Sequence, residues 1–120
     1  MTGSGQLERA VLQVLWNDPA GVSARDVMSA LPGRDLAMTT VLTVLDRLRR
    51  KGLAARREDA RPHLYFATTS REDYIADIML DALGQVPDRR TTLTRFLGGV
   101  TEADTEHLRR ALRRRPPADN

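Results

Sequence analysis

Threonines and arginines spaced along one predicted helix, residues 38–51, are the side chains best suited to chemistry in this sequence. A threonine methyl can contact the methyl of thymine, and its hydroxyl can bond a base or a phosphate; arginine binds phosphate or guanine. Thr39, Thr43 and Arg50 share the outward face of this helix, opposite the apolar side chains. The pattern predicts nucleic-acid recognition, and the residues expected at DNA are Thr39, Thr40, Thr43, Arg47 and Arg50 on this helix, with Arg61 beyond it.

A structural role competes with this interpretation, because threonine near the start of a helix often caps it. Thr39 taken alone does not separate the two roles. The shared exposed face of Thr39, Thr43 and Arg50, followed by a basic hairpin, favours DNA.

The predicted hairpin after this helix carries Arg56, Arg57 and Arg61. Phosphate contacts position a protein on DNA without specifying sequence, and an arginine at the tip could also enter a narrow minor groove. Glu58 and Asp59 oppose this role, since carboxylates near phosphates repel them. Arg61 is therefore the contact expected from the hairpin.

Charge is distributed unevenly along the chain. Residues 34–61 hold eight Arg or Lys against four acids, whereas residues 72–88 hold five acids and no Arg or Lys. A basic middle beside an acidic helix suggests one surface for a polyanion and another for a different partner.

Catalytic and metal chemistry have little support. The sequence contains no cysteine, and its two histidines, His63 and His107, lie 44 residues apart. It has no glycine-rich phosphate loop, no GxSxG motif and no suitably surrounded carboxylate pair. We therefore expect no enzyme activity, no cofactor and no metal site.

The positioning elements are predicted to be three helices (6–17, 23–31 and 38–51), a two-stranded hairpin (53–57 and 63–68), and three further helices (70–83, 90–97 and from 101). Gly52 is expected to end the third helix in the left-handed conformation. This order predicts a mainly α protein with a small β-hairpin wing, namely a winged helix-turn-helix followed by a helical dimerisation segment. The expected domains are 1–69 and 70–120.

The C-terminal helices have apolar stripes but no partner domain, so we expect them to form a homodimer. No apolar run approaches bilayer-spanning length, and the start, MTGSGQLER, lacks a signal peptide's hydrophobic stretch. A cytoplasmic protein without membrane insertion is the expectation. The residues expected to dimerise are Tyr74, Ile75, Ile78, Met79, Leu93, Phe96, Leu97, Leu108 and Leu112.

Three stretches of the chain resemble the BlaI/MecI penicillinase-repressor family: LERAVLQVLW (7–16), DLAMTTVLTVLDRLRRKGL (35–53) and DARPHLYFA (59–67). The resemblance implies a dimeric winged-helix repressor that binds double-stranded DNA at palindromic operators. It also implies induction by a membrane sensor protease, which cleaves the repressor in its dimerisation region.

Carried over residue by residue, the family's DNA positions fall on Thr39, Leu42, Thr43 and Arg50. Some relatives have a basic residue where this chain has Leu42, which leaves apolar contact with thymine. The Asn-Phe cleavage bond of staphylococcal relatives corresponds to Arg95-Phe96. The cysteine pairs of the copper-responsive branch are missing, which excludes that mode of metal sensing.

The sequence leaves two other functions open. The winged helix could be a protein-interaction module whose basic surface binds an acidic protein partner. A regulator that senses a small molecule would need a pocket between the C-terminal helices, which the sequence neither predicts nor excludes.

Overall fold

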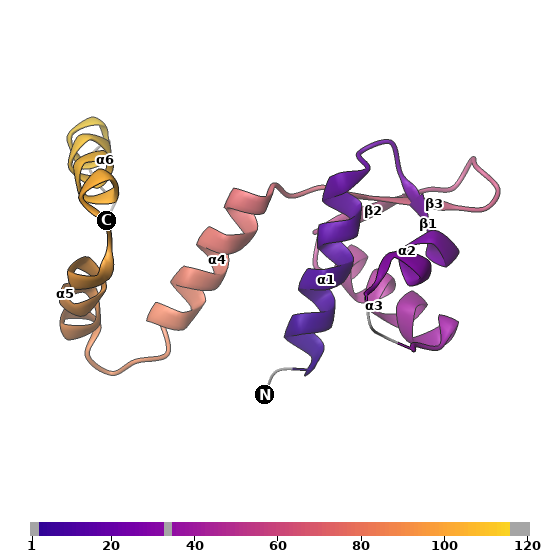
Figure 1. Ribbon diagram of the computed structural model, residues 1–120, viewed down its shortest axis with the longest axis horizontal. Coiled ribbons are helices and arrows are strands. Elements are labelled where there is room, and N and C mark those ends of the chain that lie inside the picture. The colour runs from indigo at the N-terminus through magenta and orange to yellow at the C-terminus, as the bar shows by residue number, and fades with distance from the viewer. Residues whose placement is uncertain (1–2, 33–34, 116–120) are drawn as a thin grey trace. The chain divides into compact units, whose positions relative to one another are not determined.

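The structure is a computed structural model that describes residues 3–32 and 35–115. The described residues form six helices and three short strands (Figure 1). In chain order the elements are α1 (Gly3–Asn17), β1 (Val22–Ser23), α2 (Ala24–Ala30), α3 (Met38–Arg50), β2 (Ala54–Arg57), β3 (Leu64–Ala67), α4 (Arg71–Leu83), α5 (Arg89–Gly99) and α6 (Glu102–Arg114). The mainly α winged helix-turn-helix predicted from the sequence is confirmed. The sequence predicts disorder at residues 1–5 and a loose tail at 116–120; α1 already begins at Gly3, and the tail lies outside the described residues.

The hydrophobic core joins the first three helices. Val11, Leu12 and Leu15 of α1 are fully buried, as is Val27 of α2. The inward face of α3 is the one expected from a helical period, because its buried residues recur at three- and four-residue intervals. That face consists of Val41, Val44, Leu45 and Leu48.

Local signals define where α2 and α3 begin and end. The Ser23 hydroxyl accepts a hydrogen bond from the Asp26 amide at 3.1 Å and so caps α2. No side chain caps α3 at Ala37, in agreement with the poor capping residues there. At its other end, Gly52 takes φ 78° and the Leu53 amide donates to the Leu48 carbonyl at 2.9 Å. This is the left-handed stop predicted for Gly52, and it turns the chain directly into β2.

The wing is wider than the predicted hairpin, because β1 adds a third antiparallel strand in the order β1-β3-β2. Val22 pairs with Tyr65 across one side of β3, and Arg56 pairs with Tyr65 across the other. The hairpin is therefore anchored to the segment that leads into α2.

Gly21 permits the close approach of β1 to β3. It has φ 119°, and a β-carbon at this position would lie 2.9 Å from Cβ of Leu64. Only glycine adopts this backbone conformation readily and leaves room for the neighbouring strand.

We expect Gly21→Ala to lower the free energy of unfolding by about 1–3 kcal/mol, because it adds both a strained φ and a collision with Leu64. Urea denaturation measures the change. Gly5→Ala is the control: Gly5 lies in α1 with nothing within 4 Å of an added β-carbon, so the protein should be as stable or slightly more stable. Equal stability of the Gly21 and Gly5 variants would contradict this account of β1.

The first turn of α4 packs onto the end of α1. Tyr74 is 8 % exposed and meets Trp16 edge-on, with ring centroids 5.7 Å apart, and burial raises the pKa of its phenol. The Trp16 indole donates to the Thr69 carbonyl at 2.7 Å. Tyr74 is thus a core residue of the N-terminal unit, which leaves little of its side chain exposed for the dimer interface expected from the sequence.

Residue contacts divide the chain into Met1–Ala76 and Asp77–Asn120. This division falls later than the expected boundary after residue 69, since Tyr74 ties the start of α4 to Trp16.

In the second unit, Asp88 caps α5 through the Thr91 amide and hydroxyl, which lowers the pKa of the Asp88 carboxyl. Thr101 caps α6, because its hydroxyl accepts a hydrogen bond from the Asp104 amide at 3.0 Å. Helix α5 continues through Gly98 and Gly99, two residues beyond its predicted end at residue 97.

Neither α5 nor α6 buries a residue. Of the residues expected to dimerise, Ile78 and Leu108 are half-buried. The large apolar side chains exposed on α4–α6 are Ile75, Met79, Leu80, Leu93, Phe96, Leu97 and Leu112. Within the described ranges, no helix combines the length and apolar character needed to cross a membrane.

Candidate nucleic-acid interface

The outward face of α3 presents the threonines and Leu42. Thr39, Thr40 and Thr43 are exposed, and Leu42 is 41 % exposed although it is a large apolar residue. Among the described residues of the N-terminal unit, no side chain covers this face enough to bury it. The helix that follows α2 in the helix-turn-helix therefore has a neutral, methyl-rich surface over its N-terminal half, the part that reaches base edges in such motifs.

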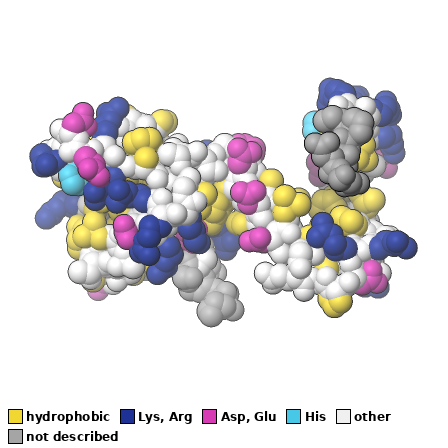
Figure 2. Space-filling view, turned by 180° about the vertical axis from the view of Figure 1, so that it is seen from behind, with side chains coloured by type: hydrophobic (Ala, Val, Ile, Leu, Met, Phe, Trp, Pro, Cys, Tyr) yellow, Lys and Arg dark blue, Asp and Glu magenta, His cyan; other side chains and the backbone are white. Residues whose placement is uncertain are grey.

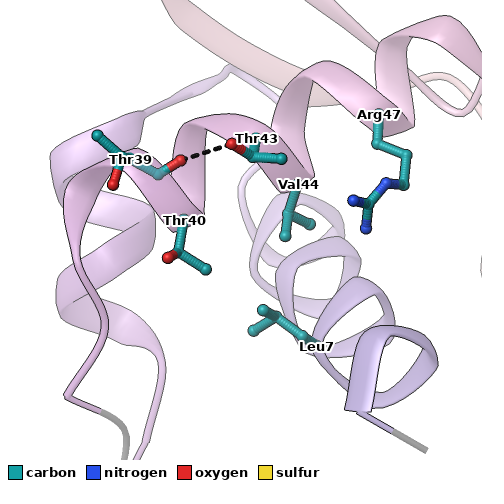
Figure 3. Close-up of a pocket in the computed structure, with 6 residues that line it drawn as sticks. All are labelled: Leu7, Thr39, Thr40, Thr43, Val44 and Arg47. Atoms are coloured by element: carbon teal, nitrogen blue, oxygen red, sulfur yellow. Dashed lines mark hydrogen bonds between the residues drawn. The ribbon is translucent and has the colours of Figure 1, made fainter. Parts of the chain in front are cut away.

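The Thr43 hydroxyl is already used within the helix. It donates to the Thr39 carbonyl at 2.8 Å, the dashed line in Figure 3. A threonine hydroxyl has one proton, so Thr43 retains its methyl group and acceptor lone pairs for an external partner.

Arg47 lies beside these threonines at a shallow hollow between α1 and α3. The hollow has a volume of about 250 Å³ and is lined by Leu7, Thr39, Thr40, Thr43, Val44 and Arg47 (Figure 3). Arg47 is half-buried, and among the described side chains no carboxylate lies within ion-pair distance of it. A guanidinium without an internal counterion, next to hydroxyls, suits a phosphate.

Arg50 differs from Arg47 because it has an internal partner. Its Nη2 lies 2.8 Å from Oδ2 of Asp46, and its Nε donates to the same oxygen at 3.1 Å. The Arg50 side chain is nevertheless 71 % exposed. It can reach phosphate only by sharing or leaving Asp46.

The three arginines of the wing differ in the groups that they bind. Nη2 of Arg56 lies 2.7 Å from Oε2 of Glu58. Arg61 folds over the tip, where its Nη1 donates to the Glu58 carbonyl at 2.7 Å and the Ala60 carbonyl at 3.0 Å. Arg57 is exposed and has no carboxylate partner in the described part of the chain, so it is freer than the sequence suggested.

Glu58 remains ionised beside these arginines. The hydrogen bond from Arg56 is the main cause that holds the pKa of the Glu58 carboxyl below its ordinary value, with Arg49 adding a smaller charge effect. Figure 2 shows the result over the N-terminal unit, where Lys and Arg side chains lie next to carboxylates.

Two contacts that position the interface were not predicted from the sequence. Lys51 Nζ lies 3.1 Å from Oε1 of Glu8, which is only 7 % exposed, and this pair ties the end of α3 to α1. A carboxylate at the apolar spacing of Val11, Leu12 and Leu15 was the available signal for it. The second is Arg49, whose Nη2 lies 3.6 Å from Oε2 of Glu58 in the wing.

Residues 3–32 and 35–115 contain no candidate metal site, since no three His, Asp or Glu side chains lie close enough together there to hold a metal ion. His63 precedes β3 and is half-buried, while His107 is exposed on α6.

A helix-turn-helix, a three-stranded wing and an exposed threonine face flanked by arginines define a winged-helix transcription regulator. The sequence model of one family, described as the penicillinase repressor, matches residues 4–114. The chain belongs to the penicillinase repressor family, as the resemblance predicted. Family membership indicates a DNA-binding transcriptional repressor.

Two curated relatives are similar over nearly their whole length. The chain is 40% identical over 129 residues to the transcriptional regulator BlaI of Mycobacterium tuberculosis strain CDC 1551 / Oshkosh, and equally to that of strain ATCC 25618 / H37Rv. Each alignment covers 98% of this chain and 94% of the relative.

Among solved structures, a MarR family protein from Bacillus stearothermophilus aligns with a TM-score of 0.48 at 21% identity, over 88% of this chain and 68% of that one. MepR, a transcription regulator of the Staphylococcus aureus multidrug efflux pump MepA, aligns with a TM-score of 0.47 at 21% identity, over 88% and 73%.

Proposed function

We propose that this chain acts as a homodimeric repressor that binds a palindromic operator through α3 and the wing. The main support is the exposed face of α3. Thr39 and Thr43 lie beside Arg47, a guanidinium without a carboxylate partner among the described residues, and Leu42 is exposed on the same helix. Neutral side chains able to read bases thus adjoin a cation able to grip phosphate.

Exposed apolar side chains support the dimer. On α5, Leu93, Phe96 and Leu97 are 45 %, 43 % and 54 % exposed and follow the spacing of one helical face. Monomeric proteins rarely leave such faces uncovered, and a two-fold dimer covers them with the same surface of a second copy.

Two-fold symmetry implies the form of the operator. Two copies of α3 related by a two-fold axis would enter successive major grooves about 34 Å apart, which requires inverted half-sites. We place this activity in the cytoplasm, where the proposed operator DNA would be accessible.

The proposal extends to inactivation by a membrane sensor protease at Arg95-Phe96, the bond that the family resemblance indicates. Both residues are exposed on α5. Cleavage there would separate α6 and the end of α5 from the rest of the chain, and local unwinding of α5 would have to precede it.

Titration of a fluorescent palindromic duplex against salt tests the proposal. We expect operator binding to weaken on the order of 10³-fold between 50 and 200 mM salt, and a random duplex of equal length to bind less tightly throughout. Equal affinity for both duplexes, or binding that salt does not change, would contradict it. Binding to polyglutamate in place of DNA would favour a protein-interaction module for acidic partners.

A further inference from the structure

Five side chains join α3 to the wing in a line of alternating charge. Asp46 lies 2.8 Å from Arg50 and 3.6 Å from Arg49, measured between carboxylate oxygens and guanidinium nitrogens. Arg49 lies 3.6 Å from Glu58, and Glu58 lies 2.7 Å from Arg56. We call this set, Arg50-Asp46-Arg49-Glu58-Arg56, the interface charge chain. Its three guanidiniums are held by two carboxylates.

Glu58 occupies the centre of this chain. Its Oε2 atom accepts hydrogen bonds from both Nε and Nη2 of Arg56, at 3.2 Å and 2.7 Å. The same oxygen is the one nearest Arg49. A phosphate oxygen would bind a guanidinium fork in the same way. The side chains of Arg49 and Arg56 are only 30% and 25% exposed, whereas Glu58 is 59% exposed. The carboxylate is therefore more accessible to solvent, and so to a polyanion, than either of the arginines that it binds.

The energetic consequence follows from counterion release. DNA affinity that is independent of sequence rises with the number of phosphates that a protein neutralises. An arginine that is already paired with a carboxylate must give up that anion to bind a phosphate. Its contribution to DNA binding is therefore smaller than that of an unpaired arginine. An exposed carboxylate at this place also repels the phosphates directly.

We propose that Glu58 is an internal competitor of the DNA backbone: it occupies Arg49 and Arg56 in the free protein and so limits affinity for DNA of any sequence. The inference rests on the proposed DNA binding and adds a residue that sets its strength. Base contacts from Thr39 and Thr43 lie outside the interface charge chain, so the limit acts on the phosphate grip.

Asp59 offers a matched control. It is exposed at the same tip, next in sequence to Glu58, and it takes part in no ion pair among the residues that the structure describes. Removing its charge changes the net charge of the wing by the same amount but releases no arginine.

The test measures binding of a random duplex and the operator duplex by wild type, Glu58→Gln and Asp59→Asn. Glutamine keeps the size of Glu58 at an exposed site. We expect Glu58→Gln to tighten random-duplex binding by roughly 5- to 10-fold at 0.1 M salt for each additional phosphate that the protein neutralises, and to steepen the log–log salt slope by about 1–2. Asp59→Asn should change affinity by about 2-fold or less, through long-range repulsion alone.

Equally tighter binding by the two variants would overturn the proposal, because charge alone would then explain the change. Weaker binding by Glu58→Gln would also overturn it, since Glu58 would then be orienting the arginines for DNA. If the wild-type chain binds neither duplex, the proposed function itself fails, and this outcome is distinct from the other two.

Discussion

A chain carrying both Phe96→Glu and Leu97→Glu should be a monomer and should bind a palindromic operator at least about 100-fold more weakly than wild type. Both side chains are apolar and exposed on α5, and no described residue covers them enough to bury them. At a two-fold interface, each introduced carboxylate would be buried close to the same carboxylate of the second copy. The loss of hydration and the repulsion between like charges would destabilise the dimer. Light scattering gives the mass, and titration of the operator duplex gives the affinity.

Arg95→Glu is the matched control, because it adds a carboxylate to the opposite side of the same helix. It should remain a dimer. A chain that ends at Arg95 should be a monomer for the same reason as the double variant, since it lacks α6 and Phe96. A dimer of unchanged mass in the double variant or the shortened chain would refute the role proposed for α5.

The second large effect concerns Thr43, whose hydroxyl proton is committed to the Thr39 carbonyl. If its methyl is what meets thymine, Thr43→Val should keep operator affinity within about 2- to 3-fold. Thr43→Ser, which keeps the hydroxyl and loses the methyl, should weaken operator binding about 5- to 10-fold and leave random duplex unchanged. Competition titrations with both duplexes measure this.

Uracil in place of thymine sharpens the Thr43 test, because it removes the methyl from the DNA side. On a uracil operator, wild type and Thr43→Ser should bind alike. Arg61→Ala is the contrasting variant, and it should weaken all sequences about equally. Loss of preference in Thr43→Val with retention in Thr43→Ser would show that the hydroxyl, and not the methyl, reads the base.

The sequence predicted α3 well because local forces determine it. Its apolar spacing defines the buried face, the run of arginines suits its C-terminal end, and Gly52 supplies the left-handed stop. The outward position of Thr39 and Thr43 follows from that same periodicity. The winged-helix order could therefore be inferred before any tertiary contact was known.

What the sequence missed depends on contacts between distant segments. Strand β1 has two residues, too few for a periodic signal, and it exists because Val22 pairs with Tyr65. The core role of Tyr74 depends on Trp16, far away in the chain. The interface charge chain arises where the wing returns Glu58 to Arg49. Counting charges along the sequence treats those arginines as free.

Hydroxyl-radical footprinting of the wild-type chain on an inverted-repeat operator shows whether two copies of α3 read successive major grooves. We expect two protected segments whose centres lie about 10 base pairs apart, one helical turn, and which appear together as protein is added. A single protected segment, or protection that appears equally on random duplex, would contradict this expectation.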